Sequence, residues 1–202
     1  MGEDGEMSET SAPRLGPRFE EALGYAAELH RTQTRKASKV PYIGHLLSVA
    51  GLVIEDDGTE TEAIAALLHD AAEDQGGEAT LAQIAARFGP EVADIVAECS
   101  DTTVVPKPPW RKRKEDYIAH LGSVSDSTIR VSMADKLDNA RAILRDLRRE
   151  GPSVWQRFNT SDPQDHLWYY RSLLAVYRQR STSWMVDELA RVIDTLAGEI
   201  AG

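Results

Sequence analysis

The sequence has little cysteine, no long hydrophobic run and no excess of positive charge. Its single cysteine, Cys99, excludes a disulfide within the chain and suits a reducing compartment. No apolar stretch approaches the roughly 18 residues of a membrane-spanning helix, and the acidic first residues lack a hydrophobic signal core. The formal net charge of −10 disfavours a general nucleic-acid-binding protein, because such domains are usually basic. We therefore expect a cytoplasmic protein with neither a membrane nor a nucleic acid as partner.

The sequence also lacks the alternating polar and apolar pattern of β-strands, and it shows no internal repeat. Residues 1–17 are rich in glycine, glutamate, serine and proline and have almost nothing to bury, which predicts a disordered acidic tail. The whole chain is 42% hydrophobic and 28% charged, as is ordinary for a globular protein. We expect residues 18–202 to form one all-α domain, a compact helical bundle.

Apolar residues recur instead with helical spacing. In the segment that begins at Phe19, for example, Ala22, Ala26 and Leu29 share one face. Residues 100–109 are rich in proline and cannot form the interior of a helix. Capping, glycine and proline signals place the expected helices at residues 19–31, 45–55, 59–72, 80–88, 92–99, 110–121, 126–150, 165–180 and 184–200.

The stretch from Ala65 to Asp74 carries the strongest chemical signal. Four apolar residues lead into the pair His69 and Asp70, and two more acids, Glu73 and Asp74, follow within one helical turn. Residues i, i+3 and i+4 of a helix share a face, so the three acids should stack beside one another. Carboxylates this close repel one another and are costly beside a buried wall unless a cation lies between them. The stretch therefore predicts a metal site.

Two further residues extend this candidate site. His45 begins an expected helix, and Asp135 lies among the apolar residues of the helix at 126–150, so its side chain should point inward. A buried carboxylate needs a partner, and a cation is the natural one. Two imidazoles and two carboxylates suit Mn, Fe, Co or Zn, and the ligands alone do not select among these metals. Alone, His45 also fits a hydrogen-bonded histidine and Asp135 a salt-bridged core acid; together they favour metal binding.

Glu73 and Asp74 lie one turn beyond the His-Asp pair and are not needed as ligands. A metal lowers the pKa of bound water toward about 7, and a nearby carboxylate can orient that water or protonate a leaving group. The alternative is a solvated helix end, but acids at the C-terminus of a helix are electrostatically unfavourable. A solvated helix end does not explain acids at so unfavourable a position, so their expected position favours a catalytic role.

Cationic side chains gather near the candidate ligands although the chain is acidic overall. Four of them lie close in sequence to these ligands: Arg35, Lys36, Lys136 and Arg141. Such clusters indicate an anionic, phosphate-bearing substrate, and Arg35 can also stack on a base. Asn139 lies one turn after Asp135 and fits a hydrogen bond to ribose or phosphate as well as a surface role. A second basic cluster surrounds Trp110, where a phosphate contact and a solvated helix start fit equally well.

The order of these motifs resembles the HD superfamily and, more narrowly, the small alarmone hydrolases and the hydrolase half of the bifunctional RelA/SpoT enzymes. The resemblance covers about residues 19–180. The residues that carry it are Arg35-Lys36, Pro41 to His45, Leu67 to Asp70 with Glu73-Asp74, Phe88 to Val92 and Ala134 to Asn139. The chain departs from the family at residues 131–133, where members usually carry a lysine or a similar polar residue, and at Gln75, where they carry threonine.

The resemblance implies a compact helical domain with one buried divalent ion, Mn²⁺. The implied metal ligands are His45, His69, Asp70 and Asp135. It also implies an enzyme that removes pyrophosphate from the ribose 3′ position of an alarmone nucleotide, with Glu73 and Asp74 positioning and activating the water. The expected substrate contacts are Arg35 at the base, Lys36 at the nucleotide, Lys136 and Asn139 at ribose and phosphate, and Arg141. Both ppGpp and ppApp fit this expectation, because base choice depends on wall contacts that the sequence does not place.

Two other functions stay open from the sequence. An HD-type phosphatase acting on a 2′- or 3′-phosphorylated nucleotide such as NADPH, or a 5′-nucleotidase, would keep the metal but release orthophosphate. A non-catalytic nucleotide-binding sensor would keep the scaffold without turnover, but it would not need Glu73 and Asp74. The expected partner is a small-molecule nucleotide, and the sequence leaves open whether the chain is a monomer or a homodimer.

Overall fold

The computed structural model describes residues 15–36, 38–100, 106 and 108–202. Within these residues the regular structure is helical, apart from an isolated β-bridge between Thr34 and Pro41. The elements are α1 (Pro17–Leu29), α2 (Ile43–Glu55), α3 (Glu60–Leu68), α4 (Ala71–Gln75), α5 (Gly77–Phe88), α6 (Pro90–Cys99), α7 (Trp110–His120), α8 (Asp126–Glu150), the 3₁₀ helix η1 (Gly151–Arg157), α9 (Pro163–Arg180) and α10 (Trp184–Ala201). The predicted all-α fold is confirmed, as are the predicted bounds of the helix at 126–150.

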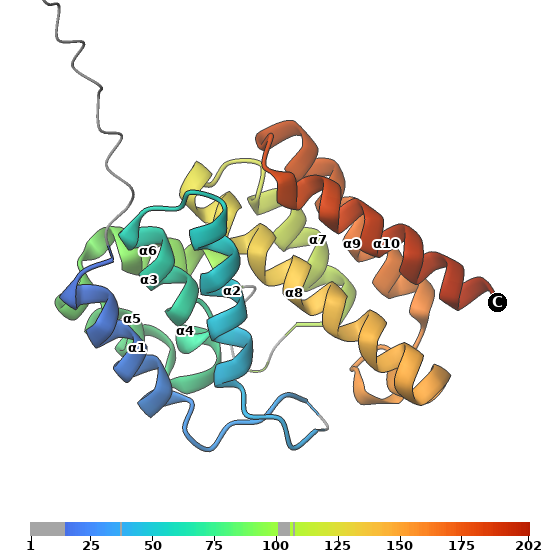
Figure 1. The fold of residues 1–202 in the computed structure, drawn as a ribbon, viewed down its shortest axis with the longest axis horizontal. Coiled ribbons are helices and arrows are strands. Elements are labelled where there is room, and N and C mark those ends of the chain that lie inside the picture. Colours follow the sequence, from blue (N-terminus) through green and yellow to red (C-terminus); the bar gives the residue numbers. More distant parts are fainter. Residues whose placement is uncertain (1–14, 37, 101–105, 107) are drawn as a thin grey trace, which may run out of the picture.

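The long helix α8 crosses the middle of the molecule (Figure 1). Helices α1 to α6 lie on one side of it, and α9 and α10 lie on the other (Figure 1). Helix α8 contacts elements of both sides, among them α2, α3, α6, α9, α10 and η1. It is therefore the element through which the two halves of the bundle share one core.

Helix α3 lies deepest in the fold. Every side chain from Ala63 to Leu68 is fully buried, and a helix that is apolar all round belongs in the interior. It packs against α1, α2, α6 and α8, while α2 and α8 also contact each other. The C-terminal end of α3 is therefore held close to both α2 and α8.

The predicted single helix at 59–72 is wrong, because α3 ends at Leu68 and a new helix, α4, begins at Ala71. The cause is a side-chain bond: His69 Nδ1 lies 2.8 Å from the carbonyl oxygen of Ala66. In a continuous helix that oxygen would accept the N–H of Asp70. The histidine thus takes the place of a backbone donor, and the chain bends at the His-Asp pair.

Helix α5 begins at Gly77, three residues before the predicted start at Thr80. Gly76 has φ 156° and Gly77 has φ 58°. Side chains disfavour such left-handed backbone, and glycine adopts it without steric cost. The two glycines therefore let the chain turn from α4 into α5 without a loop, and Thr80 is buried inside the first turns.

The predicted N-terminal tail falls mainly on residues 1–14, which lie outside the described residues, while Pro17 already belongs to α1. Most of the predicted proline-rich segment at 100–109 also lies outside them. Among the helices that the structure describes, none is long and apolar enough to cross a membrane.

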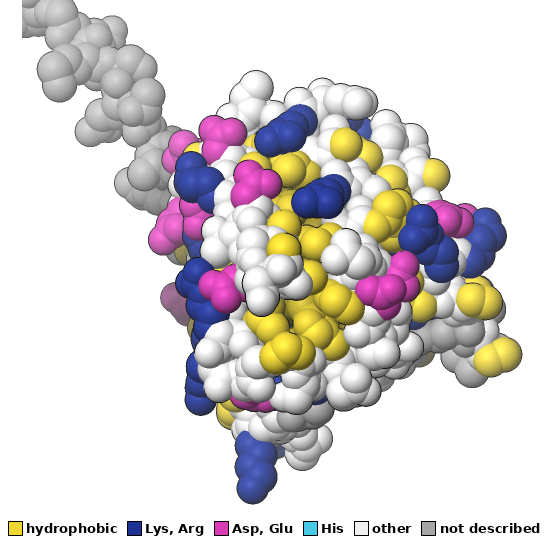
Figure 2. All heavy atoms as spheres, turned by 90° about the vertical axis from the view of Figure 1, so that its right-hand side faces the viewer, with side chains coloured by type: hydrophobic (Ala, Val, Ile, Leu, Met, Phe, Trp, Pro, Cys, Tyr) yellow, Lys and Arg dark blue, Asp and Glu magenta, His cyan; other side chains and the backbone are white. Residues whose placement is uncertain are grey.

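The surface seen from the right-hand side of Figure 1 mixes hydrophobic, basic and acidic side chains (Figure 2). Figure 2 shows a strip of hydrophobic side chains on this face, with basic and acidic side chains scattered around it. The excess negative charge of the chain is therefore not gathered on this face.

A capping box opens α3 and ties it to α8. The hydroxyl of Thr59 accepts the N–H of Glu62 at 3.2 Å, and the Glu62 carboxylate accepts the N–H of Thr59 at 2.7 Å. The same carboxylate, which is almost fully buried, pairs with Arg130 of α8 at 2.5 Å. The start of the most buried helix is thus fixed by hydrogen bonds as well as by packing.

Replacing Thr59 with alanine removes the capping hydroxyl and should lower the free energy of unfolding by about 1 kcal/mol. Urea denaturation measures this change. Thr195→Ala, which removes an exposed hydroxyl from α10, should change the free energy by less than about 0.5 kcal/mol. Equal stability of the Thr59→Ala variant and the wild type would show that the cap contributes nothing.

Candidate metal centre

Three parts of the fold bring the predicted metal ligands together. His45 is the third residue of α2, His69 and Asp70 form the bend between α3 and α4, and Asp135 lies in the middle of α8. His45, His69 and Asp70 offer ligand atoms that all lie within 4.8 Å of one another. Asp135 Oδ1 lies 3.2 Å from His45 Nε2 and 3.6 Å from His69 Nε2. All four predicted ligands therefore converge.

Two buried nitrogen atoms indicate a cation. Within the described part of the chain, Nε2 of His45 and Nε2 of His69 are buried and have no hydrogen-bond partner. Asp70 Oδ2 lies 2.9 Å from His69 Nε2 and 3.6 Å from His45 Nε2. Two ligand atoms of one ion, each about 2.1 Å from it, are about 3.0 to 3.4 Å apart. The spacing and the chemistry of the four side chains therefore fit a divalent metal ion.

The second ring nitrogen of each histidine holds its imidazole in place. His69 Nδ1 donates to the carbonyl of Ala66, as described above. His45 Nδ1 lies 2.7 Å from Asp138 Oδ2 and 3.0 Å from a guanidinium nitrogen of Arg35, which itself donates to the same carboxylate. A metal-binding Nε2 needs its lone pair, so Nδ1 carries the proton and donates to Asp138. Both imidazoles are thus oriented with Nε2 toward the centre.

Asp138 is a candidate site residue that the sequence analysis missed. It follows Asp135 by three residues and so lies on the same side of α8. Its carboxylate accepts from both Arg35 and His45. Carboxylates that bind the far nitrogen of a metal-ligating histidine fix its orientation and raise its basicity. The only sequence signal was this i, i+3 spacing.

The pKa shifts show that the centre favours positive charge. Burial lowers the pKa of His45, but the carboxylates of Asp135, Asp138 and Asp70 beside its ring outweigh burial and raise the pKa to about 9. Burial also opposes protonation of His69, yet the neighbouring carboxylates hold its pKa well above the usual range. The pKa of Asp70 lies well below its usual range although burial raises it, because both histidines lie beside it. A bound cation supplies the positive charge that these groups favour.

Glu73 and Asp74 lie in the first turn of α4 rather than at the C-terminus of a longer helix. Acids are favourable in the first turn of a helix, so the predicted electrostatic misplacement of this pair is wrong. Both residues nevertheless line a cavity of about 280 Å³ together with Asp70 and Asp135. Asp74 Oδ2 also accepts a hydrogen bond from Gln33 Nε2 at 2.7 Å. The acid pair therefore faces the same space as the two acidic ligands.

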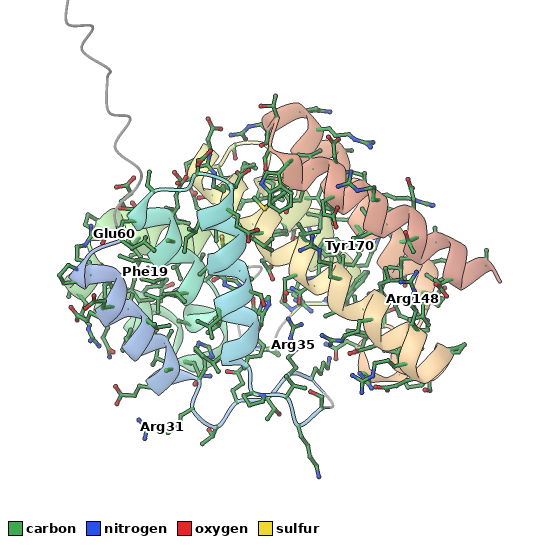
Figure 3. The ribbon with its side chains drawn as sticks, viewed as in Figure 1. Phe19, Arg31, Arg35, Glu60, Arg148 and Tyr170 are labelled. Atoms are coloured by element: carbon green, nitrogen blue, oxygen red, sulfur yellow. The ribbon has the colours of Figure 1, made fainter. Side chains whose placement is uncertain are left out.

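We call this space the inner cavity. An outer cavity of about 590 Å³ adjoins it. Both cavities are lined by Lys36, Tyr42, Trp110, Lys114, Lys136, Asn139, Phe158 and His166. Arg35 lines the outer cavity and reaches from the loop before α2 toward α8 (Figure 3). Four of the five predicted substrate contacts, Arg35, Lys36, Lys136 and Asn139, thus surround one continuous space.

Three of the lining residues also hold the acidic ligands in place. Lys136 Nζ donates to one carboxylate oxygen of Asp135, and Asn139 Nδ2 donates to the other at 2.5 Å. The hydroxyl of Tyr42 donates to Asp70 Oδ2 at 2.5 Å. The sequence analysis assigned no role to Tyr42, and its only signal was its place three residues before His45. The ligand carboxylates are thus fixed by the cavity wall.

Arg141 is not brought to the site. It is exposed, its guanidinium pairs with Glu188 of α10 at 2.9 Å, and it lines neither cavity. Two residues along a helix turn the side chain by about 200°, so Asn139 and Arg141 face opposite sides of α8. Its closeness to Asp135 in sequence was therefore misleading.

The basic cluster around Trp110 divides between two faces of α7. Arg113 and Lys114 line the inner cavity with Trp110. Arg111 and Lys112 pair with acids one turn further along the helix. Part of the cluster therefore lines the cavity, and part forms ion pairs along α7.

Several known proteins are similar to this chain. The HD domain family matches residues 22–163. The guanosine-3′,5′-bis(diphosphate) 3′-pyrophosphohydrolase MESH1 of Xenopus tropicalis is 40% identical over 138 residues, which cover 67% of this chain and 72% of the relative. Human MESH1 is 34% identical over 145 residues, covering 70% and 76%. A solved structure of a metazoan ortholog of SpoT that hydrolyses ppGpp matches with a TM-score of 0.74 at 26% identity, covering 91% of this chain and 97% of that one.

Replacing His69 with alanine removes one nitrogen ligand and should abolish stoichiometric binding of a divalent ion. The metal content of the purified protein, measured by mass spectrometry after loading and gel filtration, tests this. His120→Ala changes an exposed histidine at the end of α7 and should leave one ion per chain. Full metal content in the His69→Ala variant would place the ion elsewhere.

Replacing Asp138 with asparagine keeps an acceptor for His45 Nδ1 but removes the negative charge. The affinity for a divalent ion should fall by about 10- to 100-fold, as measured by calorimetric titration of the metal-free protein with Mn²⁺. Asp194→Asn, an exposed change on α10, serves as the matched control and should keep the wild-type affinity. An unchanged affinity in the Asp138→Asn variant would remove Asp138 from the centre.

Proposed function

The chain belongs to the HD domain family, and on this basis we propose that it is a divalent-metal-dependent hydrolase that removes pyrophosphate from the 3′ position of ppGpp. Its MESH1 relatives are named for this reaction, and the solved relative hydrolyses ppGpp. The observation that carries the proposal is the convergence of four candidate ligand side chains at one centre. The two acidic ligands of this centre line a cavity together with the acid pair Glu73 and Asp74 and with lysines. The same reaction at the 3′ end applies to ppApp.

We propose Mn²⁺ as the ion, held by His45, His69, Asp70 and Asp135. A mixed set of nitrogen and oxygen ligands accommodates this ion. When bound, the ion supplies Lewis acidity, which lowers the pKa of water toward about 7 and offsets negative charge on phosphate oxygens. The chain's own residues then carry the rest of the reaction.

Glu73 and Asp74 transfer the proton of the attacking water. A carboxylate that faces the cavity accepts a proton from the attacking water. The water oxygen forms a bond to the phosphorus next to the ribose, and the bond from that phosphorus to the ribose 3′ oxygen breaks. The proton passes to the 3′ oxygen, so the products of ppGpp are GDP and pyrophosphate.

Lysine side chains hold the phosphate groups. Lys36, Lys114 and Lys136 line both cavities and supply positive charge to phosphate oxygens. Burial would lower the pKa of Lys136, but Asp135 beside it holds that pKa well above the usual range. Lys136 therefore stays charged at neutral pH. The base and ribose extend into the outer cavity, where Arg35 is held by Asp138.

Replacing Glu73 with glutamine removes the proton acceptor but no metal ligand. Turnover of ppGpp by the Mn²⁺-loaded protein should fall by about 10²- to 10⁴-fold, while the metal content stays at one ion per chain. Release of pyrophosphate measures turnover. The matched control is Glu78→Gln, an exposed change in the first turn of α5, which should keep the wild-type rate.

The product distinguishes the competing functions. Pyrophosphate released by the wild type supports the proposal, whereas orthophosphate released from NADPH with no action on ppGpp would make the protein a phosphatase. Unchanged turnover in the Glu73→Gln variant would reject the role of this carboxylate and leave the metal site standing.

A further inference from the structure

The outer cavity continues beyond the metal centre along the second half of α8. Its lining includes Arg145 and Arg149 from α8 and Arg157 from η1, which packs against α8. At a rise of about 1.5 Å per residue, Arg145 and Arg149 lie about 15 Å and 21 Å along the helix from Asp135. The Cα–Cβ bonds of a helix tilt toward its N-terminus, which for these two arginines is the direction of the metal centre. We call these three arginines the arginine subsite.

The two arginines of α8 share one face because they are four residues apart. Arg148 lies between them in sequence but on another side of the helix. Its guanidinium pairs with Glu199 of α10 at 2.8 Å, and it lines neither cavity; Figure 3 shows it beside α10. The orientation of α8 about its own axis thus decides that Arg145 and Arg149, but not Arg148, line the cavity.

Neighbouring acids order the subsite without neutralising it. Arg157 pairs with Asp146 at 3.2 Å and with Glu150, and Arg145 pairs with the other oxygen of Asp146 at 2.9 Å. Arg149 forms no ion pair within the described part of the chain. Three guanidinium groups against two carboxylates leave a net positive charge at this end of the cavity. In a chain of net charge −10, such a lining favours an anionic ligand.

The proposed substrate has an anionic group at each end, and the 3′ pyrophosphate accounts for only one of them. We propose that the arginine subsite binds the 5′-phosphate groups of the nucleotide whose 3′ end lies at the metal centre. The subsite makes the enzyme select nucleotides that are phosphorylated at both the 3′ and the 5′ position. Arginine suits this role because its planar guanidinium group offers several donors to phosphate oxygens. The inference rests on the proposed function.

Arg149→Gln tests the subsite, because Arg149 supports no other residue through an ion pair. With the Mn²⁺-loaded full chain, this variant should raise the KM for ppGpp by about five- to tenfold and leave kcat unchanged. The KM for guanosine 3′-diphosphate, which has a free 5′ hydroxyl, should not change. Arg148→Gln is the matched control and should change neither KM. Equal effects of Arg149→Gln on both substrates, or no effect on either, would overturn the proposal.

Binding of GDP separates this proposal from the proposed function. GDP has the 5′ diphosphate but no 3′ pyrophosphate, so its affinity, measured by calorimetry, needs no turnover. The Arg149→Gln variant should bind GDP five- to tenfold more weakly than the wild type and the Arg148→Gln variant. Weakened GDP binding without any hydrolysis of ppGpp would refute the proposed reaction and keep the subsite. Hydrolysis of ppGpp with equal GDP affinity in all three proteins would refute the subsite and keep the reaction.

Discussion

The group of His45, His69, Asp70 and Asp135, in which all but Asp70 are buried, needs a positive charge at its centre. Polar and charged groups taken out of water without partners cost several kcal/mol each, and within the described residues neither histidine Nε2 has a hydrogen-bond partner. A divalent ion at this centre would satisfy all four side chains at once. Because the four side chains meet only when α2, α3 and α8 are packed together, the binding energy of such an ion would also stabilise the fold.

Helix α8 carries most of the remaining parts of the site. Asp135 faces the centre directly, Asp138 reaches it through His45, and Asn139 holds the Asp135 carboxylate. Further along the same helix, Arg145 and Arg149 line the far end of the outer cavity. A single rigid element thus sets the distance between the metal centre and the proposed subsite for the 5′ phosphates. In the proposed complex, this distance would separate the 3′ and 5′ phosphate groups of the bound nucleotide.

The sequence was sufficient to predict most of the helices and to single out His45, His69, Asp70 and Asp135, which the fold brings together, because apolar periodicity marks the buried faces and a polar residue on such a face needs a partner. It was not sufficient to predict the bend at His69, which depends on one bond to the Ala66 carbonyl. Periodicity also did not show that Asp138, and not Arg141, faces the centre, although both are charged residues near Asp135. Only the packing of α8 between α2 and α10 decides which of them faces the centre.

The most direct test of this account is anomalous diffraction from crystals grown with Mn²⁺. A single strong peak should lie about 2.0 to 2.3 Å from Nε2 of His45, Nε2 of His69 and one carboxylate oxygen each of Asp70 and Asp135. Glu73 and Asp74 should face that peak across the inner cavity without ligating it. No peak at this position, or a peak held by other side chains, would contradict the metal centre on which the proposed reaction depends.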